Sequence, residues 1–175
     1  MAKAKKISNQ GVQEIPEGTL FLIPAEDGGY ALALVARRRR RTENFVFIMF
    51  GGRRIRNEAD LDLSIANVNN CILYGKIGSD VYISDGRWKT VGKVSPWERE
   101  KWPLPKVPLG RRQVLTLSGD KIDEFTIATL DDNDFMKRTS IEVVNKLPAV
   151  VMSDGVYGLD GFGVRISNMV PWKGK

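Results

Sequence analysis

Arginine is the residue type whose spacing in this chain points most directly to chemistry. Five consecutive arginines close the second apolar run, and three more follow the third. Side chains alternate between the two faces of a strand, so every second arginine of the first run shares a face if the strand continues. Because a guanidinium group can bind a carboxylate or a phosphate through two parallel hydrogen bonds, the cluster is either a contact surface for a macromolecule or the solvated end of two strands. The candidate contact residues are Arg37, Arg39, Arg41, Arg53, Arg54 and Arg56.

Two tryptophans are a second kind of candidate contact residue. Trp97 and Trp102 lie in a segment from Ser95 to Gly110 that also holds four prolines, which rules out a regular helix or a central strand there. Tryptophan and arginine dominate the binding energy of many protein interfaces. Both tryptophans could equally pack against the folded domain, whereas Trp88, which lies in a strand pattern, is expected in the core.

Catalysis has few suitable residues in this sequence. Histidine is absent and Cys71 is the single cysteine, which excludes Ser-His-Asp and Cys-His catalysis and most catalytic zinc sites. Carboxylate and lysine chemistries remain open, but no convergent pair of Asp or Glu residues is recognisable. Asp131, Asp132 and Asp134 lack the spacing of a calcium-binding loop and predict a surface turn. We therefore expect a non-enzymatic protein with no metal and no cofactor.

Composition and charge indicate a soluble globular chain with an anionic partner. The 175 residues are 42% hydrophobic and 27% charged, and the formal net charge is +6. This charge favours nucleic acid, a membrane surface or an acidic protein face without choosing among them. No apolar stretch approaches the ~20 residues of a membrane-spanning helix, so no membrane association is expected. Residues 1–14 predict a disordered basic arm rather than a signal peptide, and the lone cysteine fits a cytoplasmic location.

Short apolar runs between Gly- and Pro-marked turns predict a mostly β (α+β) fold. The first three runs should form an antiparallel meander, because their connections are too short for crossover helices. Two short helices are expected, at Glu58–Ile65 and Ser140–Leu147. Together the elements indicate a twisted antiparallel sheet or a small barrel with one or two short helices. The expected strands are Thr19–Pro24, Tyr30–Ala36, Phe45–Phe50, Cys71–Ile77, Val81–Ser84, Trp88–Gly92, Gln113–Leu117 and Glu124–Leu130.

The proline-rich segment also suggests how the chain is divided. Prolines this dense are typical of an extended connector that wraps a domain edge or joins two lobes. We expect residues 15–110 to form a β domain. Residues 111–175 are expected to form a C-terminal β/α extension that packs on the same domain.

Several motifs, taken in order, resemble one known family. The sequence EGTLFLIP at Glu17–Pro24 is followed by DGGYALALV at Asp27–Val35 and by GRWKTVG at Gly86–Gly92, and a proline-bearing segment comes next. In this order the motifs resemble the immunity protein 26 family, over about residues 16 to 108. The resemblance implies a mostly β fold. It also implies a bacterial protein, encoded beside a polymorphic toxin, that protects the producing cell by binding and neutralising that toxin.

Two functional hypotheses follow from these patterns. The first is an immunity protein that binds its cognate toxin domain through the arginine cluster, with Trp97 and Trp102 as further contacts. Because the chain is basic, the toxin is expected to present an acidic contact surface, which chiefly accelerates association and sharpens specificity. The alternative is a small β-barrel nucleic-acid-binding protein that uses the same arginines on phosphates, and a steep salt dependence on generic DNA or RNA would support it.

Overall fold

The computed structural model describes residues 15–39, 45–51, 54–77, 81–148 and 152–157, and the predicted arm at 1–14 lies outside this part of the chain. Its strands are β1 (Thr19–Pro24), β2 (Tyr30–Arg38), β3 (Phe45–Phe50), β4 (Cys71–Ile77), β5 (Thr90–Lys93), β6 (Val107–Leu115), β7 (Lys121–Leu130), β8 (Arg138–Val144) and β9 (Met152–Tyr157). Its helical elements are α1 (Val81–Ser84) and the 3₁₀ helices η1 (Glu58–Asp60), η2 (Leu63–Ile65), η3 (Val68–Asn70) and η4 (Arg99–Lys101). The fold is mostly β, which confirms the predicted class.

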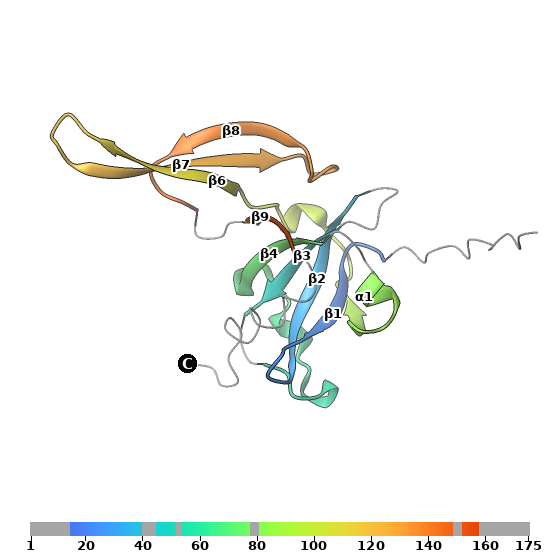
Figure 1. Cartoon of the computed structure of the whole chain (residues 1–175). Coiled ribbons are helices and arrows are strands. Elements are labelled where there is room, and N and C mark those ends of the chain that lie inside the picture. The colour runs from blue at the N-terminus through green and yellow to red at the C-terminus, as the bar shows by residue number, and fades with distance from the viewer. Residues whose placement is uncertain (1–14, 40–44, 52–53, 78–80, 149–151, 158–175) are drawn as a thin grey trace, which may run out of the picture.

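The strands form two sheets (Figure 1). The larger sheet has six strands in the order β5-β1-β2-β3-β4-β9, and the smaller has three in the order β6-β7-β8. Neighbouring strands are antiparallel except β9, which runs parallel to β4. The predicted meander is confirmed as β1, β2 and β3. Strands β6, β7 and β8 extend away from the larger sheet, and we call them the projecting sheet.

The central strands β1, β2 and β3 are buried on both faces. Odd-numbered residues such as Phe21 and Phe47 pack into one core, and even-numbered residues such as Leu22 and Ile48 pack into another. Because side chains alternate along a strand, a strand covered on both faces needs an apolar residue at nearly every position. This requirement explains why the three segments are continuous apolar runs rather than alternating ones.

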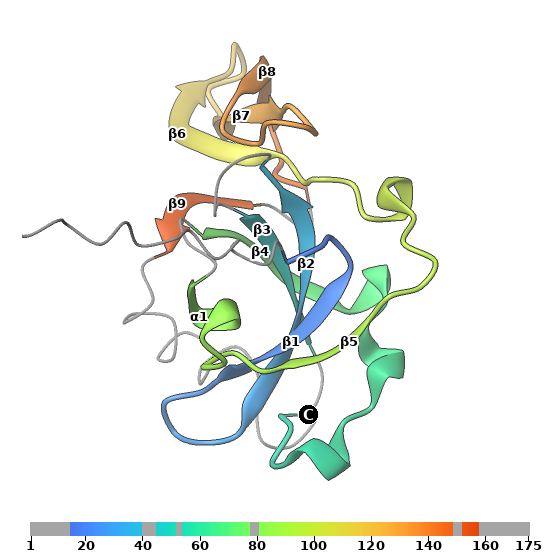
Figure 2. The same cartoon turned by 90° about the vertical axis from the view of Figure 1, so that its right-hand side faces the viewer.

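The core that the odd-numbered residues of β1, β2 and β3 face is closed by α1 and by the segment that follows α1. Ile83 of α1 is buried there, and Trp88 is 4% exposed. The Trp88 ring stacks on Phe21 with ring centroids 5.5 Å apart and an interplanar angle of 7°. In Figure 2, α1 lies on one side of the central strands and the connector between β5 and β6 passes on the other. The expectation that Trp88 belongs to the core is confirmed.

The core that the even-numbered residues of β1, β2 and β3 face is closed by the connector between β5 and β6 and by the base of the projecting sheet. Trp102 comes from the connector, Val107 from β6, Leu130 from β7, and Phe135 from the turn after β7. All four side chains are at most 7% exposed. The base of the projecting sheet is therefore part of the core, although most of β8 and of the outer half of β6 is exposed.

Two expected elements have a different structure. Val81–Ser84, expected as a strand, is the single helical turn α1, because a four-residue apolar run has no period that separates strand from helix and Ile83 alone is buried. Ser140–Leu147, expected as a helix, lies largely in strand β8. Its β-branched residues favour a strand, and β7 offers backbone partners from Phe125 to Leu130, with one register shift between Thr129 and Leu130. The helical spacing of Ile141 and Val144 was therefore misleading.

Other expectations need smaller corrections. The single helix expected at Glu58–Ile65 is divided into η1 and η2, because the Asp62 side chain accepts a hydrogen bond from the Ser64 backbone nitrogen (2.9 Å) and starts a new turn. Strand β6 passes through residue 110, where the sequence suggests a domain boundary, and that division remains a prediction. Among the described residues, no helix is long and apolar enough to cross a membrane.

Replacing Trp88 by alanine is expected to lower the free energy of unfolding by about 3–5 kcal/mol, because a buried aromatic ring is lost and a cavity remains. Urea denaturation followed by circular dichroism measures this change. Lys101→Ala is the control, since the Lys101 side chain is 70% exposed and its removal should change the free energy by less than about 0.5 kcal/mol. Equal losses in the two variants would contradict the placement of Trp88.

Candidate partner-binding site

Arg37, near the end of β2, is a buried charge at the centre of the site. Its side chain is 2% exposed, and Nε donates to Oδ1 of Asp132 over 2.5 Å. Nη1 donates to the Ala36 carbonyl oxygen (2.7 Å) and Nη2 to the Arg99 carbonyl oxygen (3.3 Å). A charge this deeply buried is tolerated only when it is paired and hydrogen-bonded. The end of β2 therefore depends on a carboxylate from the turn between β7 and β8.

The acidic turn after β7 is shaped by Asp131. Its Oδ1 accepts hydrogen bonds from the backbone nitrogens of Asn133 (2.8 Å) and Asp134 (2.9 Å), and these bonds lower the pKa of Asp131. The folded turn directs Asp132 to the buried arginine, and Oδ1 of Asp134 lies 2.9 Å from Nε of Arg39. Arg37 and Arg39 thus pair with carboxylates of the acidic turn, which lie 95 residues away in sequence.

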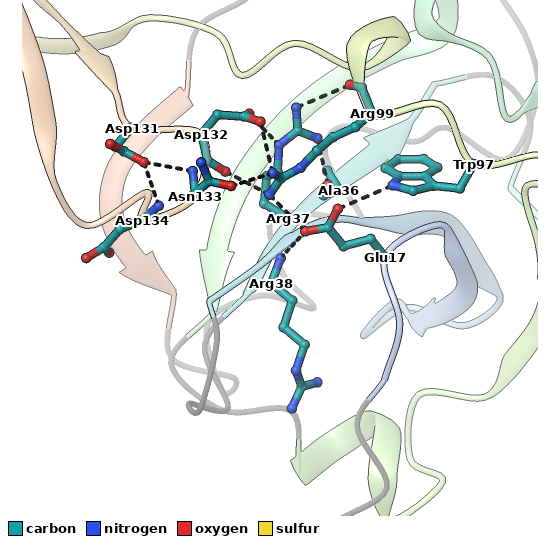
Figure 3. Close-up of polar contacts among 10 residues, drawn as sticks. All are labelled: Glu17, Ala36, Arg37, Arg38, Trp97, Arg99, Asp131, Asp132, Asn133 and Asp134. Carbon is teal, nitrogen blue, oxygen red and sulfur yellow. Dashed lines mark hydrogen bonds and ion pairs between the residues drawn. The ribbon is translucent and has the colours of Figure 1, made fainter.

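Arg99 and Glu17 complete what we call the charge cluster, which comprises Glu17, Arg37, Arg99 and Asp132 (Figure 3). Nη2 of Arg99 donates to Oε1 of Glu17 (3.0 Å) and to the Asp132 carbonyl oxygen (2.8 Å). The other carboxylate oxygen of Glu17 accepts from Nε1 of Trp97 (3.3 Å). Figure 3 shows Glu17 between the guanidinium group of Arg99 and the indole of Trp97. Glu17, just before β1, therefore links Arg99 of η4 to Trp97, which lies just before η4.

Gly18 allows Trp97 to lie against the start of β1. Its φ is +84°, a conformation that favours glycine, and an added Cβ would lie 3.0 Å from Cε3 of Trp97. Trp97 also stacks on Trp102, with ring centroids 6.0 Å apart and an interplanar angle of 17°. Trp102 is 5% exposed and meets Phe50 edge to face. The indole of Trp97 is therefore fixed in position while part of it stays accessible.

An open groove of about 710 Å³ runs beside the charge cluster. Its lining residues are Ile15, Pro16, Glu17, Arg38, Trp97, Arg99 and Asn133. In Figure 3 the guanidinium group of Arg38 points away from the cluster. The groove thus combines the indole of Trp97 with the guanidinium groups of Arg38 and Arg99, which donate to the Ile15 carbonyl oxygen (3.3 Å) and to Glu17 (3.0 Å) respectively.

The second arginine group lies at the opposite end of β2. Arg54 is 2% exposed, and its Nη1 donates to Oδ1 of Asp27 and to the Gly28 carbonyl oxygen (3.2 Å) in the β1–β2 turn. Arg56 is exposed, and both arginines line a pocket of about 310 Å³ together with Asp60 and other residues. Arg54 therefore holds the hairpin turn in place, and Arg56 lies exposed at the surface.

The predicted contact residues fall into three groups. Arg37, Arg54 and Trp102 are buried and bind or pack against other parts of the chain. Arg39, Arg56 and Trp97 are half-buried or exposed. Arg41 and Arg53 lie outside the described residues. The structure brings Arg37, Arg39, Trp97 and Trp102 to one region, whereas Arg54 and Arg56 lie apart from them.

Sequence reasoning missed the carboxylates that hold these arginines. The spacing of Asp132 and Asp134 predicts only a surface turn, and nothing in the sequence marks Glu17 or Arg99 as partners of the arginine run. The available signal was the charge complementarity between a run of arginines and a turn rich in aspartate. Among the described residues, no group of three or more His, Cys, Asp or Glu residues is placed to hold a metal ion.

The comparison with known proteins decides the family. A model described as immunity protein 26 matches residues 16–113, which is more than half of the chain. The chain belongs to the immunity protein 26 family. No curated protein and no solved structure gives a significant match. The family match includes Glu17, Arg37 and Arg99 of the charge cluster, but it ends before Asp132, so the cluster joins the family segment of this immunity protein to the chain that follows it.

Asp132→Ala is expected to lower the free energy of unfolding by about 2 kcal/mol, because it leaves the buried guanidinium of Arg37 without its carboxylate. The loss should stay below that of a fully buried pair, since Asp132 is 49% exposed. Chemical denaturation measures it. Asp123→Ala is the matched control, because it removes a carboxylate from an exposed pair with Arg111 and should cost at most about 1 kcal/mol. A larger loss in the control would argue against a special role for the buried pair.

The acidic turn also predicts a pH dependence. The pKa of Asp131 lies below its usual 3.8 in the folded state, so its ionised form contributes stability that is present above pH 3.8 and is lost as the pH falls through the lower folded value. Asp131→Asn keeps a hydrogen-bond acceptor but does not titrate. Thermal unfolding between about pH 5 and pH 2 should therefore show a shallower loss of stability in this variant than in the wild type. Parallel profiles would show that Asp131 does not contribute.

Proposed function

We propose that this member of the immunity protein 26 family binds its cognate toxin domain in a stoichiometric complex and blocks it without turnover. We place this binding in the cytoplasm of a bacterium that carries a polymorphic toxin system. Membership of the family supports an immunity role. The groove beside the charge cluster is the observation that carries the proposal for where the toxin binds, because it offers a fixed tryptophan and arginines at an open surface.

The predicted contact residues take two roles in this proposal. Arg39 and Trp97 contact the toxin at or beside the groove, and Arg41 continues the same run. Arg56 forms a second, outlying contact, and Arg53, outside the described residues, stays a candidate from the sequence. The remaining three, Arg37, Arg54 and Trp102, are buried and position these side chains rather than touch the toxin.

The toxin surface is proposed to be acidic where it meets this site. The chain carries a formal net charge of +6, and complementary charge speeds association and rejects wrong partners. The nucleic-acid alternative has no support from the family match, and the guanidinium groups of Arg37 and Arg54 are buried against carboxylates of the same chain.

The test uses the purified C-terminal domain of the toxin encoded next to this gene. Isothermal titration calorimetry should give one toxin domain per chain, and Trp97→Ala should weaken binding by about thirtyfold or more, as expected for an interface tryptophan. Arg39→Glu should weaken binding and slow association. The absence of binding by the wild-type chain would overturn the proposed function.

A matched control separates the site from general charge effects. Arg87→Glu makes the same charge change at an exposed arginine that pairs with Asp85 after α1. It should leave the affinity within about threefold of the wild type, because Arg87 does not line the groove. An equal loss in Arg39→Glu and Arg87→Glu would mean that net charge, rather than the groove, governs binding. Circular dichroism confirms that each variant is folded.

A further inference from the structure

The outer edge of β8 has no strand beside it among the described residues. A free edge presents unpaired backbone N–H and C=O groups, and proteins usually protect such an edge with proline, lysine or a covering segment. The sequence of β8, RTSIEVV, contains neither proline nor lysine. The edge is therefore suited to pair with another strand.

Aliphatic side chains stand on one face of this edge. Ile141 and Val143 are two residues apart, so they share a face, and they are 60% and 54% exposed. The residues opposite them on β7 are Ala128 and Thr126. These small neighbours leave the two aliphatic side chains protruding from the sheet.

Three ion pairs lie in the projecting sheet or at its base. Cross-strand ion pairs join Arg111 to Asp123 (2.8 Å) and Arg112 to Glu124 (2.6 Å), and Lys106 lies 2.9 Å from Glu142 of β8. A surface neutralised in this way gives no electrostatic advantage to a highly charged partner. It suits a partner strand that is itself mostly aliphatic and uncharged.

We propose that a second copy of this chain occupies the edge, with β8 pairing antiparallel to β8 about a two-fold axis at Ile141. This register pairs all of Arg138–Val144 and places Ile141 opposite Ile141, Glu142 opposite Ser140, and Val143 opposite Thr139 of the second copy. No like charges meet in it. A two-fold axis at Glu142 would instead oppose two carboxylates, which disfavours that register.

The length of the projecting sheet adds a second contact to this pairing. Ile141 lies about 10 Å from the start of β8, whereas β7 spans about 30 Å from the base to its far end, at 3.3 Å per residue. Antiparallel pairing therefore places the far end of each projecting sheet beside the larger sheet of the other copy. Leu115 and Leu117, near that end, are 70% and 112% exposed and are the side chains that this overlap would cover. Such a contact supplies area that one strand pair lacks, since stable interfaces bury roughly 1,200–2,000 Å².

This inference does not depend on toxin binding, so it is tested on the chain alone. Analytical ultracentrifugation of the full chain from about 1 to about 100 µM should show a dimer that dissociates on dilution. Ile141→Lys should raise the dissociation constant more than about tenfold by placing two ammonium groups at the axis. Val68→Lys is the control, because Val68 is an exposed aliphatic residue on the larger-sheet side at η3 and should leave the dimer unchanged.

A cysteine scan tests the register. In a Cys71→Ser background, Ile141→Cys should form a disulfide-linked dimer under mild oxidation, because directly opposed residues meet the distance limit of a disulfide. Val143→Cys should not, because the two copies of that position would be about 13 Å apart along the strands.

A monomeric wild-type chain over the whole concentration range would overturn the proposal, as would equal cross-linking at both positions. If the monomeric chain then bound the toxin domain and Ile141→Lys abolished that binding, the edge would belong to a toxin strand instead of a second copy. Failure of toxin binding with an intact dimer would leave this inference standing and overturn only the proposed function.

Discussion

The pairing of the Arg37 guanidinium with the Asp132 carboxylate is the interaction on which the rest of this structure depends. A guanidinium group that is 2% exposed has lost its hydration, and only a carboxylate and carbonyl oxygens replace it. Ala36 belongs to β2 itself, but the other two acceptors come from the connector and from the turn after β7, so β2 reaches its native environment only when both have docked. The same docking brings Trp102, Val107 and Leu130 over the core of even-numbered residues. Charge pairing and core closure are therefore parts of one event.

Much of the fold could be predicted from the sequence because its strongest signals are local. The three central strands are apolar at nearly every position and are separated by turns such as Asp27-Gly28, so their existence and order follow from adjacent residues. Prediction failed in segments whose local sequence favours a helix and a strand about equally. Val81–Ser84 is too short to show a period, and Ser140–Leu147 has helical spacing while its β-branched residues favour the strand that β7 completes.

The candidate site was predictable only in part, because the residues that meet in it lie far apart along the chain. The arginines were recognisable as a concentration of charge, but their partners lie far away in sequence, and Asp132 carries no local sign that it will meet Arg37. Burial of an arginine is also rare enough that a run of five is more readily interpreted as exposed. Trp97 and Trp102 show the same limit, because only the packed structure separates the accessible tryptophan from the buried one.

The point at which the family match ends affects which gene segments could be exchanged by recombination. The match stops at residue 113, inside β6, whereas the acidic turn that satisfies the buried arginine follows at residues 131–134. Recombination that replaced the C-terminal part of this gene would therefore remove the backbone hydrogen bonds between β6 and β7. It would also leave the buried guanidinium group of Arg37 without its carboxylate partner. An incoming segment would preserve both contacts only if it supplied a partner strand for β6 and a carboxylate within reach of Arg37. An exchange at this junction is thus constrained by the contact between Arg37, which lies before it, and Asp132, which lies after it.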